Sequence, residues 1–171
     1  MRGALCGALA ASIWAASQPL DKLVFKSAYD DIELLGRALT AGERWYPIGL
    51  AFHISNGAAF GALYANVAPA LPMPPVLRGP ALALAEHFAL WPLTSVSDRV
   101  HPARDRLTIL AANRRAFGQA TWRHLLFGIV LGELERRLNP ALEATPPQAD
   151  AAYSSNGRGS LEDAMPASPT S

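Results

Sequence analysis

Long apolar stretches separated by short polar segments dominate the chain. Residues 3–20 and 45–77 contain no Asp, Glu, Lys or Arg, and residues 79–97 contain Glu86 as their one charged residue. Charged residues make up 17% of the sequence, below the roughly 25% of soluble domains. Since a helix needs roughly 20 mostly apolar residues to cross a bilayer, the pattern predicts three transmembrane helices, over residues 3–20, 47–68 and 81–97.

A fourth transmembrane helix is predicted over residues 116–137, where Arg123 and Glu133 interrupt an otherwise apolar pattern. Arg123 follows Trp122, so its side chain is expected to extend to the lipid headgroups. The expected fold is all-α, a membrane four-helix bundle over residues 1–138. The tail, 139–171, is rich in Ala, Ser, Pro and Gly and is expected to be disordered.

The N-terminal stretch admits two interpretations. Arg2, the apolar residues after it and Ala15-Ala16-Ser17 are typical of a cleaved signal peptide. Trp14-x₄-Pro19-Leu20, however, is echoed by Trp91-Pro92-Leu93. A cleaved peptide has no reason to resemble a later helix, so we expect a retained span, with Pro19 and Pro92 each kinking or ending a helix.

The connections between the predicted spans differ in character. Five prolines after the second span make a stiff connector, so the second and third spans are expected to form a tight pair. Residues 21–46 predict a short amphipathic helix over about 28–39, lying in the membrane interface. Residues 98–115 predict a second interfacial helix from Pro102, and the basic loop 99–115 is expected to contact anionic lipid headgroups. No nucleic acid is expected, because this loop has no aromatic residues for stacking.

The distribution of Lys and Arg predicts an orientation. Ten lie in residues 21–46 and 97–123, and five in the remaining parts of the chain. The positive-inside rule places the loops 21–46 and 98–115 in the cytoplasm and both termini outside. The sequence thus predicts a multi-pass protein of a cell inner membrane, with the lipid bilayer as its partner.

A repeated motif of one histidine and two glycines marks the second and fourth spans. His53, Gly57 and Gly61 return as His124, Gly128 and Gly132, each 71 positions later. Small residues at every fourth position let helices approach closely in lipid. The repeat predicts two similar helical hairpins that pack along a seam, or a homo-oligomer formed through the same ridges; the seam residues are Gly49, His53, Gly57, Gly61, Ala120, His124, Gly128 and Gly132.

Polar residues within the predicted spans form the candidate site. They are His53, Asn56, Glu86, His87 and His124. Ionisable groups inside a membrane are costly and are therefore candidates for function. They could carry protons or ions, hold a haem between two histidines, or join Glu86 around a metal. The alternative is that each histidine is neutral and hydrogen-bonded between helices, with Glu86 paired to a histidine or to Arg123, and no cofactor or metal bound.

The repeated motif, running from His53 to Gly61 and from His124 to Gly132, resembles one in small bacterial inner-membrane proteins. These include the YagU-like proteins and related families of unknown function. The resemblance implies a multi-span inner-membrane protein with no established catalytic residues. A Gly-x-Ser-Gly nucleophile and the clusters of membrane phosphatases are also absent from the sequence. We expect a non-enzymatic membrane protein, with a small ion or solute carrier and a haem or metal redox protein as alternatives.

Overall fold

The computed structural model describes residues 1–139, and this part of the chain is helical, with no strand. The all-α prediction is therefore confirmed. The predicted disordered tail lies outside the described residues, except for Asn139. The elements are α1 (Arg2–Phe25), α2 (Asp31–Leu39), α3 (Trp45–Val67), η1 (Ala68–Ala70), α4 (Pro75–Leu90), η2 (Trp91–Leu93), α5 (Thr94–Val100) and α6 (Arg114–Leu138).

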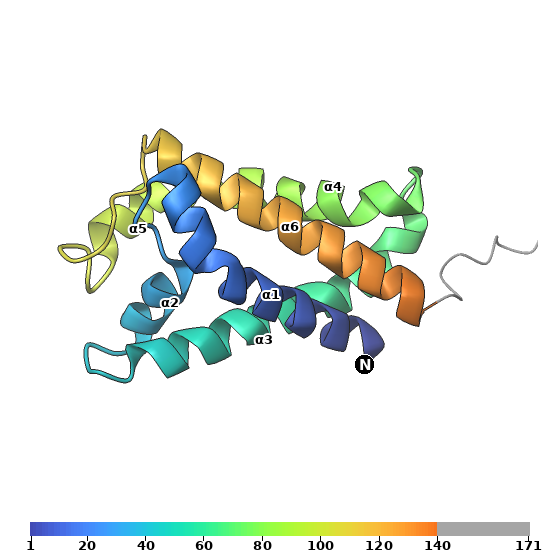
Figure 1. The fold of residues 1–171 in the computed structure, drawn as a ribbon, viewed down its shortest axis with the longest axis horizontal. Coiled ribbons are helices and arrows are strands. Elements are labelled where there is room, and N and C mark those ends of the chain that lie inside the picture. The colour runs from blue at the N-terminus through green and yellow to red at the C-terminus, as the bar shows by residue number, and fades with distance from the viewer. Residues whose placement is uncertain (140–171) are drawn as a thin grey trace, which may run out of the picture.

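The four long helices pack as two antiparallel pairs, α1 with α3 and α4 with α6, and α1 also packs on α6 (Figure 1). Although η1 and a short proline-rich segment connect α3 to α4, these two helices are not a packed pair, so that prediction is wrong. Each presents its glycine face to a different partner. The N-terminus, the α3–α4 connection and the end of α6 lie at one end of the bundle, and both long loops lie at the other (Figure 1).

Glycines bring the paired helices into backbone contact. A Cβ added to Gly7 of α1 would lie 2.0 Å from the carbonyl oxygen of Gly57 on α3. A Cβ added to Gly79 of α4 would lie 2.1 Å from the carbonyl oxygen of Gly128 on α6. Any larger residue at these positions must push the helices apart. The same device therefore joins both helix pairs.

Short-range hydrogen bonds set the ends of two helices. Asp30 caps α2 by accepting from the backbone N–H of Glu33 at 3.0 Å, and Asn113 caps α6 by accepting from Ala116 at 3.1 Å. The first turn of α2, which follows this cap, is acidic, and the helix dipole favours carboxylates there. The prediction of a short amphipathic helix in this loop is thus confirmed.

The predicted effects of three prolines can be compared with the structure. Pro19 and Pro92 were each expected to kink or end a helix: α1 continues past Pro19 to Phe25 with a visible bend (Figure 1), and α4 ends just before Pro92. No helix forms from Pro102: residues 101–113 are turns and bends. Asp98 accepts hydrogen bonds from the backbone N–H groups of Leu110 and Ala111, at 3.0 and 2.7 Å, and so folds this loop back onto α5.

The packed interior of the bundle contains small apolar residues for the most part. Its buried cluster comprises Cys6, Ala10, Ala11, Trp14, Tyr64, Ala68, Ala83, Phe127 and Leu131. Many large apolar side chains instead face outward, among them Leu5, Leu9, Ile13, Phe52, Leu63, Leu77, Phe88 and Ile129. Within residues 1–139, no single helix combines the length and the apolar content that crossing a membrane requires.

Candidate functional site

A buried arginine lies at the centre of the bundle. Arg123 of α6 has no exposed surface; its Nε and Nη2 donate to the two carboxylate oxygens of Asp21 at 2.6 and 2.7 Å. Its Nη1 donates to Asp31 at 2.8 Å, and the guanidinium lies 5.2 Å from the ring centre of Tyr29. The prediction that Arg123 reaches the headgroups is wrong, because two buried carboxylates hold it in the interior.

Neutral side chains complete the hydrogen bonding of both aspartates. Gln119, one helical turn before Arg123, donates to Asp21 at 2.7 Å. Gln18 donates to Asp31 at 2.7 Å, and Trp14 donates to the same oxygen at 3.3 Å. Positions 14, 18 and 21 lie on one face of α1, as positions four and three apart do in a helix. One face of α1 therefore binds α2 and α6 together.

His53 extends this cluster from α3. Its Nδ1 lies 2.9 Å from Oδ2 of Asp31, which accepts no other hydrogen bond from residues 1–139, and its Nε2 lies 3.2 Å from the carbonyl oxygen of Ala11. A histidine ring can donate from both nitrogens only as the imidazolium. A proton on His53 would bring the summed charge of Arg123, Asp21, Asp31 and His53 to zero.

The environment of Asp31 favours its ionised form. Burial by itself would raise the pKa of this carboxyl, but the hydrogen bond and charge of His53, with the charge of Arg123, hold the pKa below its ordinary value. Burial also raises the pKa of Tyr29, and the neighbouring charge of Asp31 adds to this effect. Asp31 is therefore a carboxylate and Tyr29 a neutral phenol at neutral pH.

The Trp14 ring lies between the charged cluster and two further histidines, His124 and His87. The Trp14 ring packs edge-on against His53 and His124, with centroids 5.1 and 4.8 Å apart, and His124 lies 4.6 Å from the ring of His87. His124 Nδ1 donates to the carbonyl oxygen of Ala120 at 2.8 Å, while its Nε2 points toward Glu86, 3.9 Å away. Glu86 is thus close to a histidine, as one of the two sequence alternatives expected, and Arg123 pairs elsewhere.

A cleft of about 290 Å³ opens beside these side chains, between α3 and α4. Polar groups from four helices face it: Asp31, His53, Asn56, Glu86 and His124. Its apolar walls come from Ala11, Trp14, Leu34, Leu35, Gly57, Phe60, Leu90 and Phe127, and Tyr29 completes the lining. The cleft exists because α3 and α4 pack against other helices and leave space between themselves.

Two smaller hollows adjoin the cleft and include residues of the loop end of the bundle in their walls. A cavity of about 210 Å³ is lined by His87, His124 and residues of η2 and α5, and another of about 100 Å³ lies against residues 106–108. Tyr29 and Leu34 line all three spaces. His124 lines the first two, so it stands between the cleft and the hollow of about 210 Å³.

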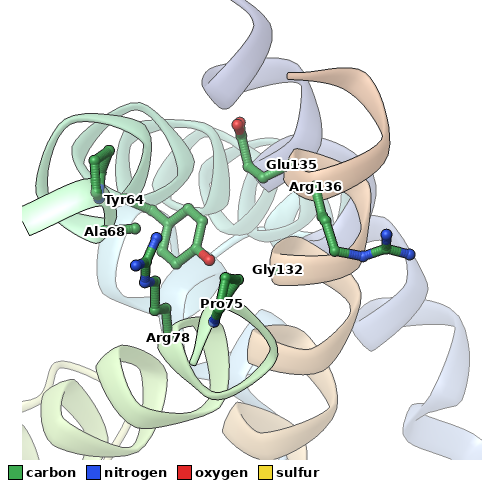
Figure 2. A pocket seen from close by; sticks show the side chains of 8 residues that line it. Tyr64, Ala68, Pro75, Arg78, Gly132, Glu135 and Arg136 are labelled. Carbon is green, nitrogen blue, oxygen red and sulfur yellow. The ribbon is translucent and has the colours of Figure 1, made fainter. Parts of the chain in front are cut away.

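A separate small cavity lies at the opposite end, where Tyr64, Arg78 and Gly132 meet near Glu135 (Figure 2). Its volume of about 20 Å³ suits a single water molecule. Glu135 is 1% exposed, and its Oε1 has no hydrogen-bond partner among residues 1–139. This cavity is too small for an organic solute.

The structure places the candidate polar residues close together, whereas the predicted seam residues are divided among several helix contacts. Four of the five line the cleft, namely His53, Asn56, Glu86 and His124, and His87 lies behind His124. Of the seam residues, Gly57 and Gly61 contact α1, Gly49 contacts α2, and Gly128 and Gly132 face α4. Ala120 and His124 also line the hollow of about 210 Å³.

Sequence reasoning missed the charged core of the site. The sequence places Asp21 and Asp31 only within the polar segment 21–46, and Arg123 was expected at the headgroups, although a buried charge requires a partner. The available signal was Arg123 as the one charged residue between positions 116 and 132, with acids after the first span. A group of three or more His, Cys, Asp or Glu suited to a metal ion is not found in residues 1–139. Comparison with protein-family models, curated proteins and solved structures finds no match for this chain.

Proposed function

We propose that the protein is a multi-pass protein of a cell inner membrane and acts as a small carrier, moving an ion or solute through the cleft between α3 and α4. No catalytic step is assigned to it. The observation that carries the proposal is the cleft itself, lined by carboxylates and histidines, with two further hollows that share Tyr29 and Leu34 with it. Titratable groups inside an apolar bundle are typical of proton and solute pathways.

The distribution of apolar side chains supports residence in a bilayer. Leu5, Leu9 and Ile13 are 57%, 43% and 46% exposed along one face of α1. Water-soluble proteins rarely leave large contiguous apolar surfaces uncovered. Glycine contacts such as Gly7 with Gly57 are typical of helices that associate in lipid.

Three ionisable residues of the long helices are compatible with this proposal because they face the interior. His53, His87 and Arg123 are 7%, 3% and 0% exposed. They lower the hydropathy of each helix taken alone, yet the assembled bundle hides them from its surroundings. The relevant surface is that of the bundle, and polar groups in membrane bundles point inward in the same way.

The arrangement of loops supports the proposed orientation. Residues 21–46 and 98–115 share one end of the bundle, while the N-terminus and the end of α6 share the other (Figure 1). At that second end Arg2 donates to the carbonyl oxygen of Leu138 at 3.3 Å. We place the loop end in the cytoplasm, where its arginines contact anionic headgroups; they are Arg99, Arg104, Arg106, Arg114 and Arg115.

Proton flux into proteoliposomes tests the carrier. The purified full chain is reconstituted with a pH-sensitive dye inside, and a potassium diffusion potential set with valinomycin drives proton entry. We expect a dye response at least several-fold above that of protein-free liposomes, with or without added solute. Flux equal to that of protein-free liposomes, for a protein shown to be folded and inserted, would contradict a proton pathway.

The variant His124→Asn examines the route. Asparagine can still donate to the carbonyl oxygen of Ala120, as Nδ1 of His124 does at 2.8 Å. It cannot carry a proton on the side that faces Glu86. Flux is expected to fall to near the protein-free level while the melting temperature changes little. Glu133→Gln, on the exposed end of α6, serves as a control with undiminished flux.

A further inference from the structure

The cleft combines negative charge with aromatic walls. Asp31 and Glu86 bring two carboxyl groups to it, and Trp14, Phe60 and Phe127 bring three aromatic side chains. Phe60 and Phe127 are themselves in edge-on contact, with centroids 5.4 Å apart, and Phe127 lies 6.0 Å from Trp14. The aromatic side chains therefore form one continuous wall, which adjoins the polar groups because Trp14 also packs against His53 and His124.

Within the described residues 1–139, no Lys or Arg lines this cleft, so its walls carry no permanent positive charge. The nearest guanidinium, that of Arg123, is buried, and all three of its nitrogens donate to Asp21, Asp31 or the carbonyl oxygen of Tyr29. An anion such as a phosphate or a carboxylate would meet two carboxyl groups, and the His53 ring in the lining is already engaged by Asp31 and by the carbonyl oxygen of Ala11.

Glu86 is the carboxyl group best placed to bind a ligand. Asp31 already accepts from Arg123, Gln18 and Trp14, whereas the ionisable group found within 4 Å of Glu86 among residues 1–139 is the His124 ring, 3.9 Å away. That distance exceeds a hydrogen bond. The Glu86 side chain is 39% exposed, so a molecule entering between α3 and α4 can reach it.

We propose that the cleft binds a small organic cation, a protonated amine carried on an apolar body. The ammonium lies at Glu86, and the apolar body lies against Trp14, Phe60 and Phe127. This identifies the substrate class of the proposed carrier and rests on that function. Aromatic faces attract cations as well as apolar groups. A volume of about 290 Å³ admits a molecule with a single aromatic ring and a short amine chain.

An inorganic cation fits the same space less well. Small metal cations require several oxygen ligands converging at short distance. In this cleft the carboxyl groups of Asp31 and Glu86 come from different helices, and apolar carbon makes up most of the remaining wall. The aromatic wall contributes to the binding of an organic cation but not to that of a hydrated metal ion.

Equilibrium dialysis against protein in lipid nanodiscs tests this proposal. Three radiolabelled probes of similar size are compared at pH 7: 2-phenylethylammonium, the neutral 2-phenylethanol and the anionic 3-phenylpropionate. Empty nanodiscs correct for partition into lipid. We expect saturable binding of the ammonium, binding of the alcohol at least tenfold weaker, and no saturable binding of the carboxylate.

Substitutions locate the bound charge. Glu86→Gln is expected to weaken ammonium binding at least tenfold without changing that of the alcohol, and Glu86→Asp to retain most of it. The matched control, Glu133→Gln, changes a carboxyl group that is bound to Arg136 and Arg137 far from the cleft. Its ammonium binding should equal that of the unmodified protein.

The outcomes separate this inference from the proposed function. Equal saturable binding of all three probes, or preference for the carboxylate, overturns the cation assignment while leaving a solute-binding cleft in place. Ammonium binding unaffected by Glu86→Gln overturns the assigned site. Saturable, Glu86-dependent ammonium binding in a protein that shows no proton flux would support the cation site and count against the carrier.

Discussion

Arg123 donates two hydrogen bonds, of 2.6 and 2.7 Å, to the carboxylate of Asp21, which lies 102 residues earlier in the chain. Through this pair the C-terminal helix α6 is bound to the end of α1. A third bond, to Asp31, adds the start of α2. Charged side chains thus hold together an interior whose apolar residues are mostly small. The cleft lies directly beside this cluster of Arg123, Asp21 and Asp31.

Removing the guanidinium should destabilise the fold severely. Arg123→Leu leaves Asp21 and Asp31 buried without their cation, and breaking a buried ion pair in this way costs about 3–5 kcal/mol of unfolding free energy. We expect a large fall in melting temperature in detergent. Arg137→Leu, which removes an exposed ion pair with Glu133, provides the control. This variant should melt near the melting temperature of the unmodified protein. Equal melting temperatures for both variants would show that Arg123 is not a structural centre.

A methyl group at the α4–α6 contact should separate these helices. Gly79→Ala places a carbon 2.1 Å from the Gly128 carbonyl oxygen, and overpacking of this kind costs about 1–3 kcal/mol. Gly118→Ala, in helix α6, is the matched control because its added carbon lies 3.4 Å from the Phe25 side chain, an ordinary contact. Thermal unfolding should show Gly79→Ala destabilised and Gly118→Ala unchanged or more stable.

Acid should destabilise the protein through Asp31. The pKa of Asp31 is lower in the folded protein than in the unfolded chain, so its stabilisation is complete above the unfolded value of about 3.9 and is lost as the pH falls through the folded value. Melting temperature measured from pH 7 to pH 3 should decline below about pH 4. The decline should be smaller in Asp31→Asn, which starts from a lower melting temperature. An identical decline in both proteins would assign the acid sensitivity to other groups.

The orientation of the bundle can be measured directly. A C-terminal fusion to alkaline phosphatase, which folds only outside the cytoplasm, is expected to be active. A fusion to green fluorescent protein, at the same position, is expected to be dark when exported through the general secretory route. The opposite result for both reporters would invert the proposed placement of loops 21–46 and 98–115.

The apolar pattern along the chain was sufficient to predict four long helices and their approximate positions. Helix periodicity and capping depend on neighbouring residues, so Asp30 and Asn113 could signal helix starts from sequence alone. The glycine motif likewise indicated close helix packing. Its partners could not be read from spacing, because Gly57 contacts Gly7 and Gly128 contacts Gly79, and these pairings depend on the assembled bundle.

The sequence by itself determined an all-helical chain with polar residues placed singly within apolar helices. Only the tertiary structure decided that Asp21, Asp31, His53 and Arg123 share one interior, since they come from four separate helices. A buried charge must find its counter-charge wherever the fold supplies it, and that choice is made by three-dimensional packing. The same packing leaves α3 and α4 apart, and so creates the cleft that no local pattern could reveal.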